Sequence, residues 1–105
     1  MKIIKVEYTA REDFVKTNKE NIRAVMDELR GLNADVKYFV SLKENGRTFV
    51  HIAMSRDEEA SNIIPNLESF KKFKEQLATG VESQPNSENL DIVNSSFDIF
   101  NTSEV

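Results

Sequence analysis

Alternation of apolar and polar side chains predicts strands in the first half of the chain. From Ile3 to Tyr8, apolar residues alternate with charged ones. Residues 36–42 alternate in the same way, and a third such stretch, Thr48–Ser55, follows Asn45-Gly46. A period of two is the repeat of a half-buried strand, and Asn-Gly favours a tight hairpin turn. We therefore predict one strand followed, further along, by a hairpin.

A helical repeat lies between the first strand and the hairpin. Apolar residues over 14–29 recur at three- and four-residue spacing, and Asn18 falls on the same stripe. This spacing predicts an amphipathic helix from about Glu12 to Arg30. Thr9 to Glu12 fits a capping box at its start, and Gly31 stands where a C′ glycine ends a helix.

Two further helical pieces are predicted after the hairpin. Ser55-Arg56-Asp57-Glu58 can start a short helix over about Asp57–Ile64, which Pro65 should end. Phe70 and Phe73 then recur at helical spacing in a second piece that ends at Gly80.

The last fifth of the chain is more polar. Residues 81–88 read as a loop, Leu90–Phe100 as a final strand, and residues 101–105 as a loose tail. The resulting order is β-α-β-β-(αα)-β. This is the ferredoxin-like α+β arrangement, an antiparallel sheet with helices on one face. We expect a single domain over residues 1–100.

The hairpin register predicts which residues share a face. A two-residue turn at Asn45-Gly46 places Glu44 opposite Arg47 and Val40 opposite His51. The His51 face then carries Val36, Tyr38, Val40, Leu42, Phe49, His51, Ala53 and Ser55. The other face also holds large apolar groups, namely Phe39, Val50, Ile52 and Met54. Helices cover one face, so we expect a homodimer through the other. The alternative is that the loop over 81–88 and the tail fold over that face.

Composition narrows the function. Among 105 residues, 14 Lys and Arg stand against 18 Asp and Glu, a net charge of −4, which disfavours binding to a nucleic-acid backbone. There is no cysteine and one histidine, so thiolate and histidine-rich metal sites are not expected. No apolar run approaches the ~20 residues that span a bilayer. We expect a soluble, cytoplasmic domain without metal, cofactor, nucleic acid or membrane.

Over about residues 1–100 the chain resembles the dimeric α/β-barrel superfamily, especially domains similar to antibiotic biosynthesis monooxygenases. The residues that carry the resemblance include Arg47-Thr48-Phe49-Val50-His51-Ile52, Glu58-Glu59-Ala60, Phe70…Phe73 and Leu90…Val93…Ser96-Phe97. It implies a ferredoxin-like protomer whose sheet joins that of its mate, with a small-molecule pocket between helices and sheet. Some relatives are cofactor-independent oxygenases; others degrade haem, act as isomerases or have no known activity. This chain has no Trp, which several oxygenases and haem-degrading members use.

His51 and Asn18 are the candidate catalytic residues. A neutral imidazole at position 51 can act as a general base or orient a ligand, and the alternative is a packed histidine with one hydrogen bond. An amide at position 18, inside an apolar stripe, can anchor a substrate carbonyl or hydroxyl. Its alternative is a residue at the edge of the stripe that meets water or caps the backbone.

Four aromatic residues are candidate ligand contacts. Tyr8 and Tyr38 combine an apolar ring with a hydroxyl tip, and Phe70 and Phe73 can form pocket walls. For each of them core or interface packing is the alternative. We hypothesise a homodimer that binds or acts on a small aromatic or carbonyl compound, by monooxygenase-like or isomerase-like chemistry without a cofactor if it is an enzyme. The alternative is a non-catalytic ligand-binding or structural dimer.

Overall fold

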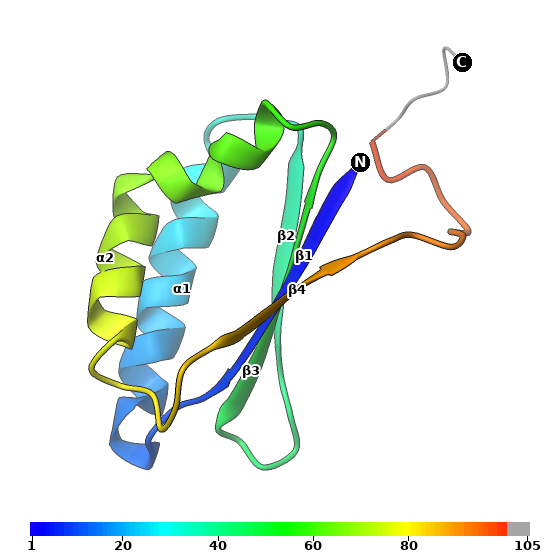
Figure 1. Cartoon of the computed structure of the whole chain (residues 1–105). Helices are drawn as coiled ribbons and strands as arrows, with labels where there is room; N and C mark the ends of the chain where they lie inside the picture. The colour runs from blue at the N-terminus through cyan, green and yellow to red at the C-terminus, as the bar shows by residue number, and fades with distance from the viewer. Residues whose placement is uncertain (101–105) are drawn as a thin grey trace.

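Four antiparallel strands form one sheet in the order β2-β3-β1-β4, and two α-helices cover one of its faces (Figure 1). The computed structural model describes residues 1–100, and the predicted loose tail over 101–105 lies outside them. The elements are β1 (Lys2–Thr9), α1 (Val15–Arg30), β2 (Val36–Leu42), β3 (Thr48–Ser55), α2 (Glu68–Leu77) and β4 (Asn86–Leu90). This is the predicted ferredoxin-like α+β fold.

The predicted hairpin register is confirmed, although its turn differs. Val40 lies opposite His51 in β2 and β3. Among the described residues only Gly46 and Asn33 have positive φ, so Asn45 does not adopt the left-handed conformation that a two-residue Asn-Gly turn requires. Instead, the Asn45 side-chain oxygen accepts hydrogen bonds from the backbone N–H groups of Arg47 and Thr48, each at 2.9 Å. A local side-chain bond of this kind replaces the second positive φ.

The long predicted helix begins later than expected and ends at Arg30 as predicted, but its capping at both ends differs. Residues Glu12–Phe14 form a 3-10 turn, η1, before α1. The Thr9 hydroxyl does not cap it, because β1 continues through Thr9 and places that hydroxyl 2.8 Å from the Thr48 hydroxyl. Gly31 has a φ of −71°, and the left-handed residue after the helix is Asn33. Asparagine is the non-glycine residue that tolerates this conformation best.

The predicted short helix over 57–64 is instead a pair of 3-10 turns, η2 (Ala60–Asn62) and η3 (Ile64–Asn66). The Asp57 carboxylate accepts a hydrogen bond from the Ala60 N–H at 2.8 Å, in place of the predicted capping box over Ser55–Glu58. Pro65 does not end this segment but lies in the first turn of η3. Proline is tolerated there because an N–H at that position has no helical partner.

The prediction for the last strand is wrong. β4 occupies Asn86–Leu90, largely within the predicted polar loop, and pairs with β1 so that Val6 lies opposite Ser87. All five β4 residues are exposed. A polar segment forms this edge because the β1 backbone supplies the hydrogen bonds, whereas β-propensity mainly reflects side-chain packing. Residues 91–100 continue without regular structure (Figure 1).

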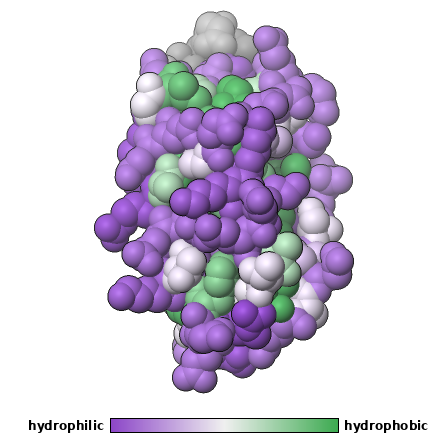
Figure 2. Space-filling view, turned by 90° about the vertical axis from the view of Figure 1, so that its left-hand side faces the viewer, coloured by the Kyte–Doolittle hydropathy of each residue, from purple (hydrophilic) through white to green (hydrophobic). Residues whose placement is uncertain are grey.

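The core lies between the sheet and the two helices. It combines Val25 and Leu29 from α1 with Phe73 and Leu77 from α2, packed on Phe49 and the other inward side chains of the sheet. The outer surface of the helix layer is mainly hydrophilic, with small apolar areas between the hydrophilic groups (Figure 2). The His51 face of the sheet is therefore the one that the helices cover.

Candidate functional site

Four polar side chains form a continuous chain of hydrogen bonds beneath the helices. The Asn18 amide Nδ2 donates to the Tyr8 hydroxyl at 2.8 Å. That hydroxyl lies 2.7 Å from Nε2 of His51, and the Tyr38 hydroxyl lies 2.6 Å from Nδ1 of the same ring. Both imidazole nitrogens are thus engaged.

The sheet register explains why these groups meet. His51 lies opposite Val6 in β1 and Val40 in β2, so Tyr8 and Tyr38 occupy diagonal positions on the same face. Diagonal neighbours are within reach of long aromatic side chains. Asn18 approaches from α1, which packs over this face, and its side chain is wholly buried.

Burial keeps the chain electrically neutral. Loss of hydration lowers the pKa of His51 to about 4. The same effect raises the pKa of the Tyr38 hydroxyl well above its usual range. It also raises the pKa of Tyr8, although the hydrogen bond from Asn18 acts in the opposite direction. At neutral pH these four side chains therefore present hydrogen-bond donors and acceptors without a net charge.

The hydrogen-bond chain lies beside an apolar cavity between the sheet and α2. The cavity has a volume of about 450 Å³. Tyr8, Tyr38 and His51 contribute to its wall on the sheet side, and Phe70 and Phe73 contribute from α2. The ring centroids of Phe73 and His51 are 5.5 Å apart, so an aromatic surface adjoins the imidazole. An apolar enclosure with a few convergent polar groups is typical of a small-molecule site.

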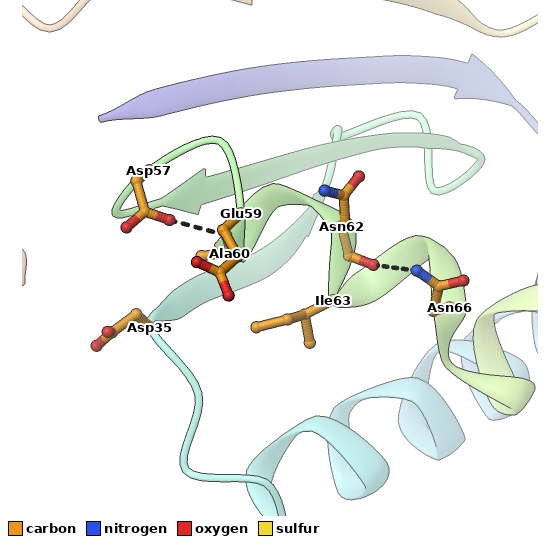
Figure 3. A pocket seen from close by; sticks show the side chains of 7 residues that line it. All are labelled: Asp35, Asp57, Glu59, Ala60, Asn62, Ile63 and Asn66. Atoms are coloured by element: carbon orange, nitrogen blue, oxygen red, sulfur yellow. Dashed lines mark hydrogen bonds between the residues drawn. The ribbon is translucent and has the colours of Figure 1, made fainter.

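A second, more acidic hollow of about 550 Å³ lies beside η2 and η3 (Figure 3). Two of its three carboxylates have structural partners: Asp57 accepts from the Ala60 N–H, and Asp35 pairs with Arg56 at 3.2 Å. Within residues 1–100, no three metal-ligating side chains gather into a possible metal site. The hydrogen-bond chain, and not this hollow, is therefore the candidate centre of function.

The sequence-predicted residues converge on this one place. Asn18, Tyr8, His51 and Tyr38 form the chain, while Phe70 and Phe73 line the cavity. The alternative in which Asn18 meets water is wrong, because its side chain is 0% exposed. His51 is buried, as its packing alternative expects, but the ring has two hydrogen-bond partners instead of one.

Several cavity residues were not foreseen from the sequence. They include Ser61, Ile64, Lys74, Pro85 and Ser87. Pro85 and Ser87 reach the cavity because β4 lies next to β1, and the predicted position of the last strand did not place them there. The helical spacing of Lys74 relative to Phe70 is a signal that could have assigned it to the same side of α2.

The fold has known counterparts among solved structures. An antibiotic biosynthesis monooxygenase superposes with a TM-score of 0.78 at 15% identity, covering 90% of this chain and 100% of that one. Rv0793 from Mycobacterium tuberculosis gives 0.78 at 11% identity, covering 91% and 98%. NE2512, a protein of unknown function from Nitrosomonas europaea, gives 0.73 at 17% identity, covering 92% and 94%. The chain has the fold of the antibiotic biosynthesis monooxygenases.

Sequence comparison adds no narrower assignment within this monooxygenase fold. No family model matches the chain. No curated protein matches it either. Structural likeness at these identities establishes the architecture, while activity depends on the groups in the site. Among the described helices, none is long and apolar enough to cross a membrane.

Proposed function

We propose that the protein binds a small aromatic or carbonyl compound in the cavity between the sheet and α2. This proposal rests on one observation: an apolar cavity of about 450 Å³ adjoins a buried hydrogen-bond chain that ends at Tyr38. Phe70 and Phe73 offer aromatic surface to a planar ring. His51 and Tyr38 offer polar contacts that orient its oxygen.

Two kinds of chemistry are compatible with such a ligand. In a cofactor-independent oxygenase or isomerase, the ligand supplies the electron density, and the cavity stabilises an anionic form through hydrogen bonds. In a non-catalytic binding protein, the same bonds only select the ligand. The low pKa of His51, about 4, favours the second, because so weak a base removes few protons at neutral pH. Asn18 does not line the cavity and acts through Tyr8, so its role is positioning.

We further propose that two copies pair through the uncovered sheet face. Phe39 on this face is 49% exposed, and Ile52 and Met54 beside it are only partly covered. The loop over 81–88 does not fold over this face, since residues 86–88 belong to β4 at the sheet edge. Within residues 1–100, Ile3 at the β1 end of this face is buried, whereas the part around Phe39 carries exposed apolar surface, which fits an isologous contact between two copies.

Ligand binding can be tested with 1-acetonaphthone, an aromatic ketone, followed by two-dimensional NMR. We expect shift changes at residues that line the cavity. Ala53→Phe should abolish them by filling the cavity, because Ala53 lines it. Met54→Phe is the matched control, since the neighbouring side chain points to the opposite face of the strand. Absence of binding, or binding that survives Ala53→Phe, would overturn the proposal.

Turnover separates the two chemical alternatives. The protein is incubated in air with 1-naphthol, and the naphthol is then analysed by mass spectrometry. Oxygenated product that disappears in His51→Gln supports the oxygenase. Recovery of unchanged naphthol, with binding of the naphthol retained, argues against the oxygenase.

A further inference from the structure

We infer that Asn18 fixes the tautomer of His51 through Tyr8, so that Tyr38 presents its O–H to the cavity as a donor. The site then selects ligands that carry a hydrogen-bond acceptor, such as a carbonyl oxygen. The ligand part rests on the proposed function, whereas the tautomer part does not. Asn18 is a positioning residue in this arrangement.

The direction of the chain begins at Asn18. Its Nδ2 donates to the Tyr8 oxygen at 2.8 Å. With one lone pair of that oxygen occupied, the Tyr8 proton is directed to Nε2 of His51, 2.7 Å away. Among the described residues, Asn18 and His51 are the only side-chain partners of the Tyr8 hydroxyl. Tyr8 is almost wholly buried, so its proton needs an acceptor, and Nε2 of His51 provides one.

The imidazole passes this direction on. A neutral histidine carries a proton on one nitrogen only. If Nε2 accepts from Tyr8, the proton lies on Nδ1, which donates to the Tyr38 oxygen at 2.6 Å. The Tyr38 O–H then donates to no member of the hydrogen-bond chain, and Tyr38 lines the cavity. The ligand therefore meets an O–H donor at this point.

The reverse direction is less well satisfied. The Asn18 Oδ1 atom is buried without a partner. Turning the amide over would pair Oδ1 with the Tyr8 proton, but Nδ2 would lose its hydrogen bond to the Tyr8 oxygen. Buried N–H groups without partners are rarer than carbonyl oxygens without partners. The observed amide orientation thus selects one polarity for the entire chain.

The tautomer of His51 can be measured directly, because the protein contains a single histidine. In protein labelled with ¹⁵N-histidine, the two imidazole nitrogen shifts distinguish a proton on Nδ1 from one on Nε2. We expect the Nδ1–H form in the wild-type protein at neutral pH. Observation of the Nε2–H form would overturn the inference, and this measurement requires no variant.

A pair of asparagine variants tests the part played by Asn18. Asn18→Leu removes the donor to Tyr8, so we expect a mixture of tautomers. Asn21→Leu is the matched control: Asn21 lies on the same helix and donates to Gln76 at 2.7 Å, outside the chain. We expect it to retain the wild-type tautomer. An unchanged Nδ1–H population in folded Asn18→Leu would contradict the role of Asn18. If that variant does not fold, Tyr8→Phe removes the same link between Asn18 and His51 and should give the mixture of His51 tautomers.

Ligand selection is tested with two probes of similar shape. 1-Acetonaphthone carries an acceptor, and 1-ethylnaphthalene does not. We expect the ketone to bind about tenfold more tightly, as one neutral hydrogen bond provides, and Tyr38→Phe to remove the preference. If neither probe binds, the proposed function fails while the tautomer result stands. If both bind equally to wild-type protein with the Nδ1–H tautomer, the donor role of Tyr38 fails and ligand binding stands.

Discussion

The Tyr8 hydroxyl and Nε2 of His51 lie 2.7 Å apart, although the two residues are not directly opposite each other in the sheet. Tyr8 faces Phe49, and His51 faces Val6, so the contact crosses the sheet diagonally. The tyrosine ring spans this offset while it stacks on Phe49 at a centroid distance of 5.6 Å. One side chain therefore serves both the apolar core and the polar chain.

Tyr8→Phe should destabilise the protein by about 1–3 kcal/mol, because it leaves a buried Asn18 donor and one imidazole nitrogen without partners. Tyr38→Phe should cost less, since Tyr38 lies at the cavity and is only partly buried. Urea unfolding followed by circular dichroism measures both. Equal losses would show that the inner part of the chain is no more important to stability than its outer end.

Stability should fall as the pH is lowered from 6.5 towards 4. The pKa of His51 is about 4 in the folded protein and 6.5 in the absence of burial, so the unfolded chain binds the proton first. The stabilisation is complete above pH 6.5, and the full difference corresponds to about 3 kcal/mol. Urea unfolding at several pH values measures it.

The control for this pH dependence is His51→Gln, which keeps an amide near the tyrosines but does not titrate. Its unfolding free energy should lack the slope between pH 4.5 and 6.5. Glu7 and Glu28, whose hydrogen bonds with Lys43 and Ser69 hold their pKa below 4.5, contribute mainly below this interval. A slope that persists in His51→Gln would assign the effect to other groups.

The sequence predicted the elements that alternate strongly, and it predicted the hairpin register. Periodicity over β1, α1 and β2 reflects one more deeply buried face in each, and burial leaves a pattern in a single sequence. β4 leaves no such pattern, because all of its side chains are exposed and only its backbone is bound. The final strand was therefore placed in the more apolar stretch after it.

The candidate site was predicted as a set of residues but not as a chain. The hairpin register placed Tyr38 and His51 on one face. Their connection to Tyr8 and Asn18 depends on β1 lying beside β3 and on α1 packing above it. Strand order and helix position are long-range properties, which periodicity along the chain does not encode.

Gly80→Ala should destabilise the fold by about 1–3 kcal/mol through overpacking, because a methyl group there would collide with the buried Phe14 ring. Gly31→Ala is the matched control: its φ of −71° suits alanine, and the added atom meets only ordinary contacts. We expect this variant to be unchanged or slightly stabilised. Thermal unfolding of the two variants compares them, and a tolerated Gly80→Ala would contradict the close approach of Phe14.

Pairing through the open sheet face predicts a particle of about twice 12.0 kDa in light scattering at micromolar concentration. Phe39→Glu should convert it to a folded monomer, because a carboxylate would lose its hydration in the middle of an apolar contact. Leu32→Glu is the matched control, since Leu32 is exposed to the same extent, 51% against 49%, but lies in the turn after α1. A wild-type monomer would contradict the pairing, and a dimer that Leu32→Glu disrupts and Phe39→Glu does not would place the contact elsewhere. The His51 face is already covered by α1 and α2, so loss of the dimer in Phe39→Glu should leave 1-acetonaphthone binding intact, which separates assembly from ligand recognition.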